Sequence, residues 1–160
     1  MKGFDAEFHD LDHYIRVITD RYRAEWAAAG HRADTLPLMG TTRHMVIAST
    51  EAEAQDLARE AYARWHRSFM YLWDLNGTKP GAYFPATWDE LAGAGRALAG
   101  TPQTVREQLL HQIEVSGINF VLTRFAFGDI PFVHSQRSVS LFASDVMPWI
   151  LERTSSLQAA

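Results

Sequence analysis

The chain has 160 residues, of which 47% are hydrophobic and 12% aromatic, so it carries enough apolar material for the core of one globular domain. Its formal net charge is -4 and its basic residues are scattered among acidic ones, which argues against a nucleic-acid-binding surface. Cysteine is absent, which excludes disulfides, zinc-thiolate sites and thiol nucleophiles.

The first residues, MKGFDAEFHDLDH, are acidic where a signal peptide would have an apolar core. No segment approaches the length of about 18 apolar residues that a membrane span needs. We therefore expect a cytoplasmic protein that does not cross a membrane. A helix is predicted from about residue 10 or 12 to Gly30, since apolar residues recur there every three or four positions: Ile15, Ile18, Tyr22 and Trp26.

The next elements are a short strand and a long helix. RHMVIAS, residues 43–49, is an apolar run with β-branched residues and predicts a strand. Thr50 and Glu53 then form a capping box, which indicates the start of a helix. That helix carries one heavy apolar stripe, made of Ala54, Leu57, Ala61, Trp65, Phe69 and Leu72.

An irregular loop and a short helix follow. Residues 74–86, DLNGTKPGAYFPA, hold two glycines and two prolines and predict a loop. Thr87 and Glu90 form a second capping box, which predicts a short helix that extends through Leu98. Gly93 and Gly95 weaken that helix.

The stretch GTPQTVREQLLHQIEVSGINFVLTRFAFGDI, residues 100–130, predicts a helix and then a strand. Thr101 caps the helix, Pro102 occupies its first position and Gly117 ends it. INFVLTRFAF is almost continuously apolar, as strands buried on both faces of a parallel sheet are. A last helix is predicted from about Phe132 to Val146, with Pro148 as its end.

Alternating helices and strands indicate an α/β fold, but this pattern provides two strands in a predominantly helical chain. Two parallel strands cannot close a barrel, and they leave sheet edges without partners. The periodicity alone therefore predicts part of a larger architecture.

Five strings, in the same order, resemble the luciferase-like flavin-dependent monooxygenases, the family of bacterial luciferase. They are RYRAEWAAAG, VIASTEAEAQDLAREAY, GTPQTVREQLLHQIEVSG, INFVLTRFAFGDI and HSQRSVSLFASDVMP, and the resemblance extends over about residues 14–150. The family fold is a (β/α)8 TIM barrel, which needs about 250 residues. The resemblance thus implies the carboxy-terminal part of such a barrel, as one domain over residues 1–160.

The resemblance also implies a chemistry. In the family, reduced flavin such as FMN reacts with oxygen and oxygenates an aldehyde, an alkane or another small apolar substrate, and some members use a deazaflavin for hydride transfer. Barrel enzymes place their ligands at the carboxyl ends of the strands. In this chain those ends are residues 48–50 and 124–129.

Three residues at the second strand end are candidates for flavin binding. Arg124 can form a bidentate pair with a phosphate or a reduced-flavin anion, or alternatively an ion pair with Asp129. Phe127, like Phe125, either walls an isoalloxazine pocket or belongs to the core. Gly128 either lets the backbone approach a ligand or only makes a turn.

No catalytic residue follows from the sequence. His44 is expected to lie toward the amino-terminal half of its strand, away from the catalytic face, in a structural role. The histidines show no metal-ligand spacing, and no glycine-rich phosphate loop or nucleophile elbow is present. We expect no metal.

A second hypothesis is a fragment without catalytic activity that binds another chain. The apolar Tyr71-Leu72-Trp73 cluster suits a lid over a barrel mouth or a partner surface. Exposed strand edges favour self-association, so we expect a homo-oligomer or a complementing chain.

Overall fold

The computed structural model describes residues 11–81 and 83–158. Its strands are β1 (Gly40–Ile47), β2 (Ala97–Gly100) and β3 (Phe120–Arg124). Its helices are α1 (Leu11–Ala28), α2 (Glu51–Leu75), α3 (Trp88–Gly93), α4 (Pro102–Ser116), α5 (Phe132–Leu141) and α6 (Met147–Gln158), with a 3-10 turn η1 (Ala33–Thr35) and a π-helical turn η2 (Phe142–Val146). None of the helices within these residues is long and apolar enough to cross a membrane.

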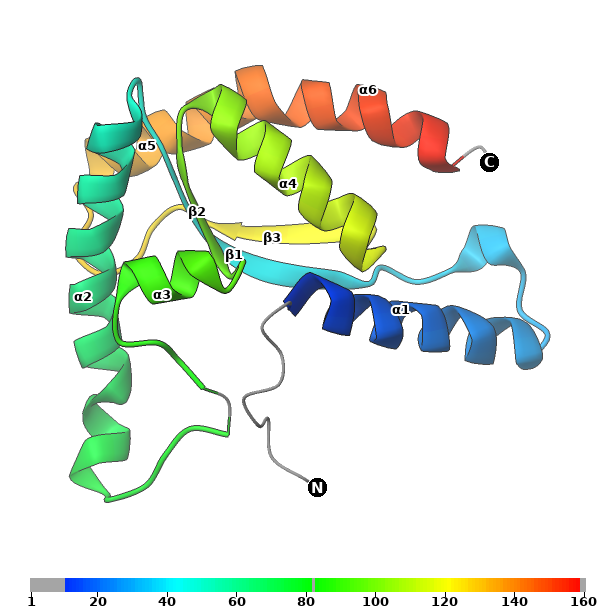
Figure 1. The fold of residues 1–160 in the computed structure, drawn as a ribbon, viewed down its shortest axis with the longest axis horizontal. Helices are drawn as coiled ribbons and strands as arrows, with labels where there is room; N and C mark the ends of the chain where they lie inside the picture. The colour runs from blue at the N-terminus through cyan, green and yellow to red at the C-terminus, as the bar shows by residue number, and fades with distance from the viewer. Residues whose placement is uncertain (1–10, 82, 159–160) are drawn as a thin grey trace.

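A small parallel sheet with strand order β2-β1-β3 lies at the centre, so β1 has a strand on each side (Figure 1). Side chains alternate along β1, and the two faces join different hydrophobic clusters. Val46 packs with α2 and α3, whereas Met45 and Ile47 pack with α4 and the carboxy-terminal helices. The predicted α/β class, with helices in the majority and few strands, is therefore confirmed.

The three predicted helix starts are confirmed. Each cap threonine accepts a hydrogen bond from the amide three residues later: Thr50 from Glu53 at 3.2 Å, Thr87 from Glu90 at 3.3 Å and Thr101 from Thr104 at 3.3 Å. Gly117 ends α4 in the left-handed region at φ 67°, as its position after the apolar stripe predicts.

The helix predicted through Leu98 is wrong, because α3 ends at Gly93 and β2 follows. Gly95 adopts a φ of 68° and reverses the chain. Ala97–Gly100 then pair with β1 and are all buried. A strand of four residues is too short to show a period, so the capping box and the alanines of this segment favoured a helix.

The prediction that residues 118–127 form a strand buried on both faces is also wrong. The strand β3 covers residues 120–124 and alternates between exposed and half-buried side chains, with Phe120 39% and Leu122 53% exposed. The cause is position, since β3 is an edge strand and helices cover one of its faces. Its apolar sequence predicts more burial than the described residues provide.

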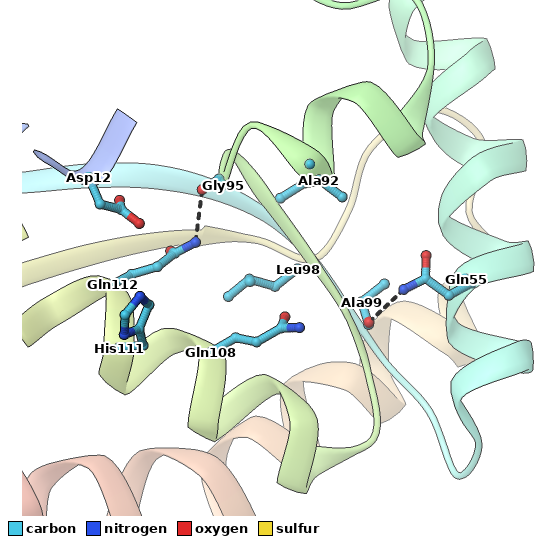
Figure 2. Close-up of a pocket in the computed structure, with 11 residues that line it drawn as sticks. Asp12, Gln55, Ala92, Gly95, Leu98, Ala99, Gln108, His111 and Gln112 are labelled. Atoms are coloured by element: carbon cyan, nitrogen blue, oxygen red, sulfur yellow. Dashed lines mark hydrogen bonds between the residues drawn. The ribbon is translucent and has the colours of Figure 1, made fainter. Parts of the chain in front are cut away.

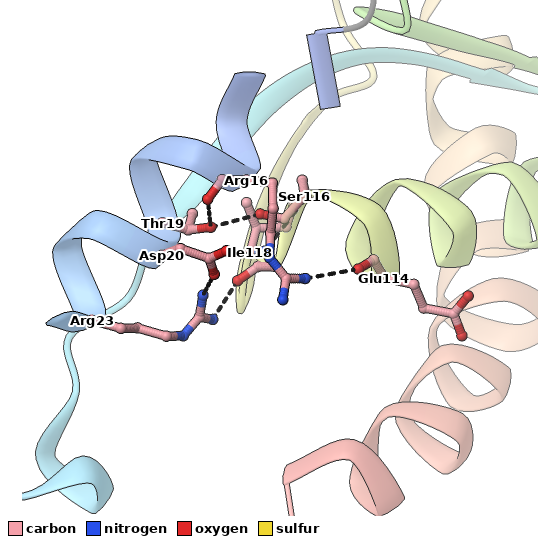
Figure 3. A network of polar contacts seen from close by, with 8 residues as sticks. Arg16, Thr19, Asp20, Arg23, Glu114, Ser116 and Ile118 are labelled. Atoms are coloured by element: carbon pink, nitrogen blue, oxygen red, sulfur yellow. Dashed lines mark hydrogen bonds and ion pairs between the residues drawn. The ribbon is translucent and has the colours of Figure 1, made fainter. Parts of the chain in front are cut away.

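Helix α1 docks through polar contacts rather than through the predicted apolar stripe, because Ile18 is 50% exposed and Tyr22 42% exposed. Thr19 donates from Oγ1 to the Ser116 carbonyl at 2.7 Å, as Figure 3 shows. Arg16 and Arg23 donate to the Glu114 and Gly117 carbonyls. Carbonyls at the end of α4, which lack helical partners, thus receive their donors from α1.

The carboxy-terminal helix does not end at Pro148. The π-helical turn η2 widens the helix just before α6, and Pro148 is the second residue of α6. Proline, which has no amide donor, fits there because a π-helical turn leaves one backbone N–H group without its usual hydrogen bond to the carbonyl four residues earlier.

Two residues hold the segment around β3 close to the rest of the fold. Ser138 is fully buried, and its hydroxyl accepts from the Ile47 amide and donates to the Ile47 carbonyl, both at 3.0 Å. Gly128 has a φ of 61°, and a Cβ atom there would lie 2.0 Å from the Ala61 carbonyl oxygen. The backbone approach at Gly128 is therefore an approach to α2.

We expect Gly128→Ala to lower the free energy of unfolding by about 3 kcal/mol or more, because it adds a clash to an unfavourable φ. Gly77→Ala is the matched control, since Gly77 has a φ of 59° and open space around its Cβ position. Gly77→Ala should lower the free energy of unfolding by about 1 kcal/mol, because it adds only the unfavourable φ and no clash. Urea denaturation measures both, and equal losses would contradict the clash.

We expect Ser138→Ala to lower the free energy of unfolding by about 1–3 kcal/mol, because it leaves a buried amide and carbonyl of β1 without partners. Ser140→Ala is the control, since Ser140 is exposed and donates to a carbonyl of its own helix. The control should stay within about 0.5 kcal/mol of the wild type. A loss no larger than that in Ser138→Ala would refute the bridging role.

Candidate active site

The candidate site lies where β1 and β3 end. The chain leaves β1 into α2 on one face of the sheet, and it leaves β3 into α5 on the other face. In open α/β sheets, ligands bind in the crevice that forms where neighbouring strands connect to opposite faces. The two strand ends singled out in the sequence are thus adjacent in the fold.

His44 is a buried imidazole in this region, 6% exposed. Its ring lies edge-on to three aromatic rings, with centroid distances of 4.7 Å to Phe127, 4.8 Å to Trp65 and 5.7 Å to Tyr62. Its Nε2 atom is buried and has no hydrogen-bond partner among the described residues. Burial, together with the positive charges of Arg124 and Arg96, lowers the pKa of His44 to about 4. His44 is therefore neutral at pH 7.

Arg124 pairs with His44 in the register of β1 and β3, so both side chains belong to the same face of the sheet. Arg124 is exposed. Asp129, the alternative partner considered from the sequence, instead pairs with Arg64 at 3.1 Å. Among the described residues Arg124 has no salt bridge, which leaves its guanidinium available to an anion.

Phe127 and Phe125 point to different faces. Phe127 is 6% exposed and stacks on Trp88, with a centroid distance of 6.1 Å and an interplanar angle of 4°. Phe125 packs against Phe142 on the other face, with a centroid distance of 5.4 Å. Phe127 thus belongs to the core, and its contact with the site is through the His44 ring.

Two carboxylates of α2 occupy neighbouring positive groups, namely the amino terminus of α4 and the Arg137 guanidinium. Glu51 accepts from the Thr101 amide at 3.0 Å and from the Thr101 hydroxyl at 2.9 Å, so the chain's own carboxylate occupies the amino terminus of α4. Glu53 pairs with Arg137. Two cations near His44 have no carboxylate partner among the residues described. Arg96 donates to the Tyr83 carbonyl and lies over the Phe84 ring, whereas Arg124 is exposed and has no such contact within the described chain.

The expectation that His44 lies toward the amino-terminal half of its strand is wrong. The strand extends over residues 40–47 rather than 43–49, so His44 is central in β1 instead of near its beginning. One signal could have indicated the correct place. His44 shares the two-residue period of Val46 and Ala48, the core positions of one face.

The described residues contain no cluster of three or more histidine or acidic side chains that could hold a metal ion. His66 contacts the Phe84 carbonyl oxygen at 3.3 Å. What the site provides is a neutral imidazole, a guanidinium and apolar surface, which suit a ligand with an anionic group and an aromatic or apolar body.

The low pKa of His44 makes stability depend on pH. Between pH 6.5 and about 4 the unfolded chain binds a proton that the folded chain refuses, so the free energy of unfolding falls as the pH falls through this window. Across this window the free energy of unfolding should fall by about 3 kcal/mol. The variant His44→Phe should not show this dependence on pH. Denaturation at several pH values measures it, with His111→Phe, an exposed histidine, as control. Equal slopes in His44→Phe and the wild type would contradict a buried neutral His44.

Several known proteins are similar to this chain. It is 31% identical over 133 residues to the uncharacterized protein y4wF of Sinorhizobium fredii, which corresponds to 83% of this chain and 39% of that protein. The fold is similar to the monooxygenase RslO1 from Streptomyces bottropensis, with a TM-score of 0.70 at 21% identity, over 87% of this chain and 39% of that one.

A second similar structure is the oxygenating constituent of 3,6-diketocamphane monooxygenase from Pseudomonas putida, a type II Baeyer-Villiger monooxygenase in complex with FMN. Its TM-score is 0.55 at 21% identity, over 84% of this chain and 39% of that one. The chain thus spans about 39% of the length of these relatives.

The sequence model of the luciferase-like monooxygenases matches residues 6–119, which is more than half of the chain. The match covers α1, β1, α2, α3, β2 and α4. The chain therefore belongs to the luciferase-like monooxygenase family.

Proposed function

We propose that the chain is part of a flavin-dependent monooxygenase that oxygenates a small apolar organic substrate and uses reduced FMN. The observation that carries the proposal is Arg124 at the end of β3, which has no salt bridge among the described residues and pairs in register with the buried, neutral His44, in a chain of this family. The FMN complex of one similar enzyme supports the choice of cofactor.

The residues present fit a flavin. Arg124 offers two parallel donors to a phosphate or to the anionic ring of a reduced flavin. His44 offers a polar ring atom that has no protein partner, and the aromatic rings around it fix its plane. Reduced flavin, when bound, supplies the reaction with oxygen, while this chain orients it and excludes water. A deazaflavin would use the same guanidinium.

The surface near Arg124 suits an apolar substrate. Leu122 lies two residues before Arg124 on the same strand face, and Phe120 two residues before that. Both are exposed, at 53% and 39%. An apolar substrate or the flavin ring can cover them, which favours binding by burial of apolar area.

The rest of the pocket must come from outside residues 11–158. We propose that residues 1–160 act as one cytoplasmic domain that a further β/α segment completes, from a complementing chain or a second copy. The edge of β3 away from β1 has no strand partner among the described residues. Strand pairing at that edge and burial of the exposed β3 face would extend the sheet toward a barrel.

The second candidate function is partner binding without catalysis. It is favoured by the apolar end of α2, where Tyr71, Leu72 and Leu75 are each more than 60% exposed. Together with β3, this surface would hold another chain whether or not flavin binds.

Flavin titration of Arg124→Ala tests the proposed site. FMN should bind the wild type with quenching of its fluorescence, and Arg124→Ala should weaken FMN about 10–100-fold, the loss expected for a charge-assisted contact. If Arg124 holds the phosphate, the affinity for riboflavin, which lacks that phosphate, should change little between the wild type and Arg124→Ala. Arg21→Ala, which removes an exposed arginine of α1, is the control and should bind like the wild type.

The association state of the same samples, read by light scattering, separates the two candidates. Binding of FMN by an associated form supports the monooxygenase part. Association without any flavin binding contradicts it and supports the partner-binding module. Equal FMN affinity in Arg124→Ala and the wild type would exclude Arg124 from the site.

A further inference from the structure

A cavity of about 270 Å³ lies along the outer edge of β2, at the side of the sheet opposite to β3 (Figure 2). β2 itself forms one wall, and glutamines from α2 and α4 line the others: Gln55, Gln108 and Gln112. The volume lies just below the range of about 300–1,000 Å³ that is common for small-molecule sites. It is suited to one small ring system.

The backbone of β2 presents hydrogen-bonding groups to this cavity. Ala48 donates from its amide to the Gly100 carbonyl at 3.2 Å, so Gly100 faces β1. Because residues alternate along a strand, Leu98 also faces β1, whereas Ala97 and Ala99 direct their amides and carbonyls outward. The Ala97 carbonyl and the Ala99 amide therefore form an acceptor and a donor side by side on the open edge.

Two glutamines bracket this pair. Gln55 donates from Nε2 to the Ala99 carbonyl at 2.9 Å, and Gln112 donates from Nε2 to the Gly95 carbonyl at 2.9 Å (Figure 2). Their side chains occupy the two ends of the edge, so a long strand cannot add there. The open stretch between them is limited to Ala97 and Ala99.

A buried polar network fixes the orientation of Gln112. Arg43, 3% exposed, donates from Nε to the Gln112 side-chain oxygen at 3.0 Å and from Nη2 to Asp12 at 3.2 Å. The Gln112 oxygen therefore faces Arg43, and its amide nitrogen faces Gly95. Because Asp12 balances the charge of Arg43, this end of the cavity favours a neutral ligand.

Gln108 completes the wall opposite to the strand. It is exposed, and its amide makes no hydrogen bond with the rest of the described chain. Figure 2 shows its side chain below Leu98 and to the left of Ala99. Its amide can donate or accept, so it can adapt to a second polar atom of a ligand.

We propose that this cavity binds a neutral, planar nitrogen heterocycle that has an adjacent hydrogen-bond donor and acceptor, as nucleobases have. The ring donor meets the Ala97 carbonyl, the ring acceptor meets the Ala99 amide, and Gln108 covers the ring. The site is separate from the proposed flavin site, because β1 lies between β2 and β3.

1-Methylcytosine is a suitable probe, since its amino group and the neighbouring ring nitrogen N3 are a donor and an acceptor, and its N1 methyl group removes the second ring donor. Nitrogen-15 NMR of the full chain should show shifts of the Ala97 and Ala99 amides and of the Gln108 side chain, with a dissociation constant on the order of 1 mM. 1,N4,N4-Trimethylcytosine, which lacks the amino donor, should bind about tenfold more weakly than 1-methylcytosine.

Gln108→Trp should fill the cavity and weaken the binding of 1-methylcytosine about tenfold or more, whereas Glu107→Trp, at the neighbouring exposed position on α4, should not. The same spectra show that both variants are folded. The proposal is overturned if about 20 mM 1-methylcytosine shifts none of these amides, if the trimethyl compound binds as well as 1-methylcytosine, or if Gln108→Trp has no effect. None of these outcomes depends on flavin binding.

Discussion

The backbone pairing of β1 is the constraint on which the rest of the fold depends. β2 pairs with its carboxyl half, residues 44–47, and β3 with its amino half, residues 40–44, so His44 pairs on both sides. The remaining edge groups of β1 need other partners. Ser138 bonds to the Ile47 amide and carbonyl, and Arg43 donates to the Thr42 carbonyl at 3.2 Å. Side chains thus complete the edges that the two staggered strands leave open.

The same stagger creates the candidate site. After Arg124, the last residue paired with β1, β3 leaves the sheet and α5 takes its place beside Ile47. The two strand ends therefore separate and lead to helices on opposite faces. His44 pairs with β2 on one side and with Arg124, the last paired residue of β3, on the other. This position in the middle of the sheet buries the imidazole and leaves its Nε2 atom without a hydrogen-bond partner among the described residues. A residue forced into the core by register, and left polar, is a feature expected of functional rather than packing positions.

The sequence predicted the local features of the fold, such as the helix caps, but it did not predict which residues the tertiary structure pairs or buries. Thr50, Thr87 and Thr101 cap their helices because a cap depends on residues within one turn. β2 was missed because four residues become a strand only when β1 lies beside them. The burial of β3 was overestimated because the apolar run 118–127 cannot show how much of the sheet is present. The central position of His44 in β1 was not predicted, because the strand begins at Gly40, before the apolar run of residues 43–49 that indicated it.

The face of β3 that we propose to bind flavin is also the face that the described helices leave exposed. In an α/β barrel each strand turns one face to the helices and the other to the interior. Here α4 and the carboxy-terminal helices cover the first face, while His44, Leu122 and Arg124 belong to the second, which α2 covers only near the strand ends. A chain segment that completes the sheet must therefore meet the residues proposed to meet flavin. If both bind this face, the binding of the partner segment and the binding of flavin are thermodynamically coupled. A partner that buries Leu122 then changes the affinity for flavin by a certain factor, and flavin changes the affinity for that partner by the same factor.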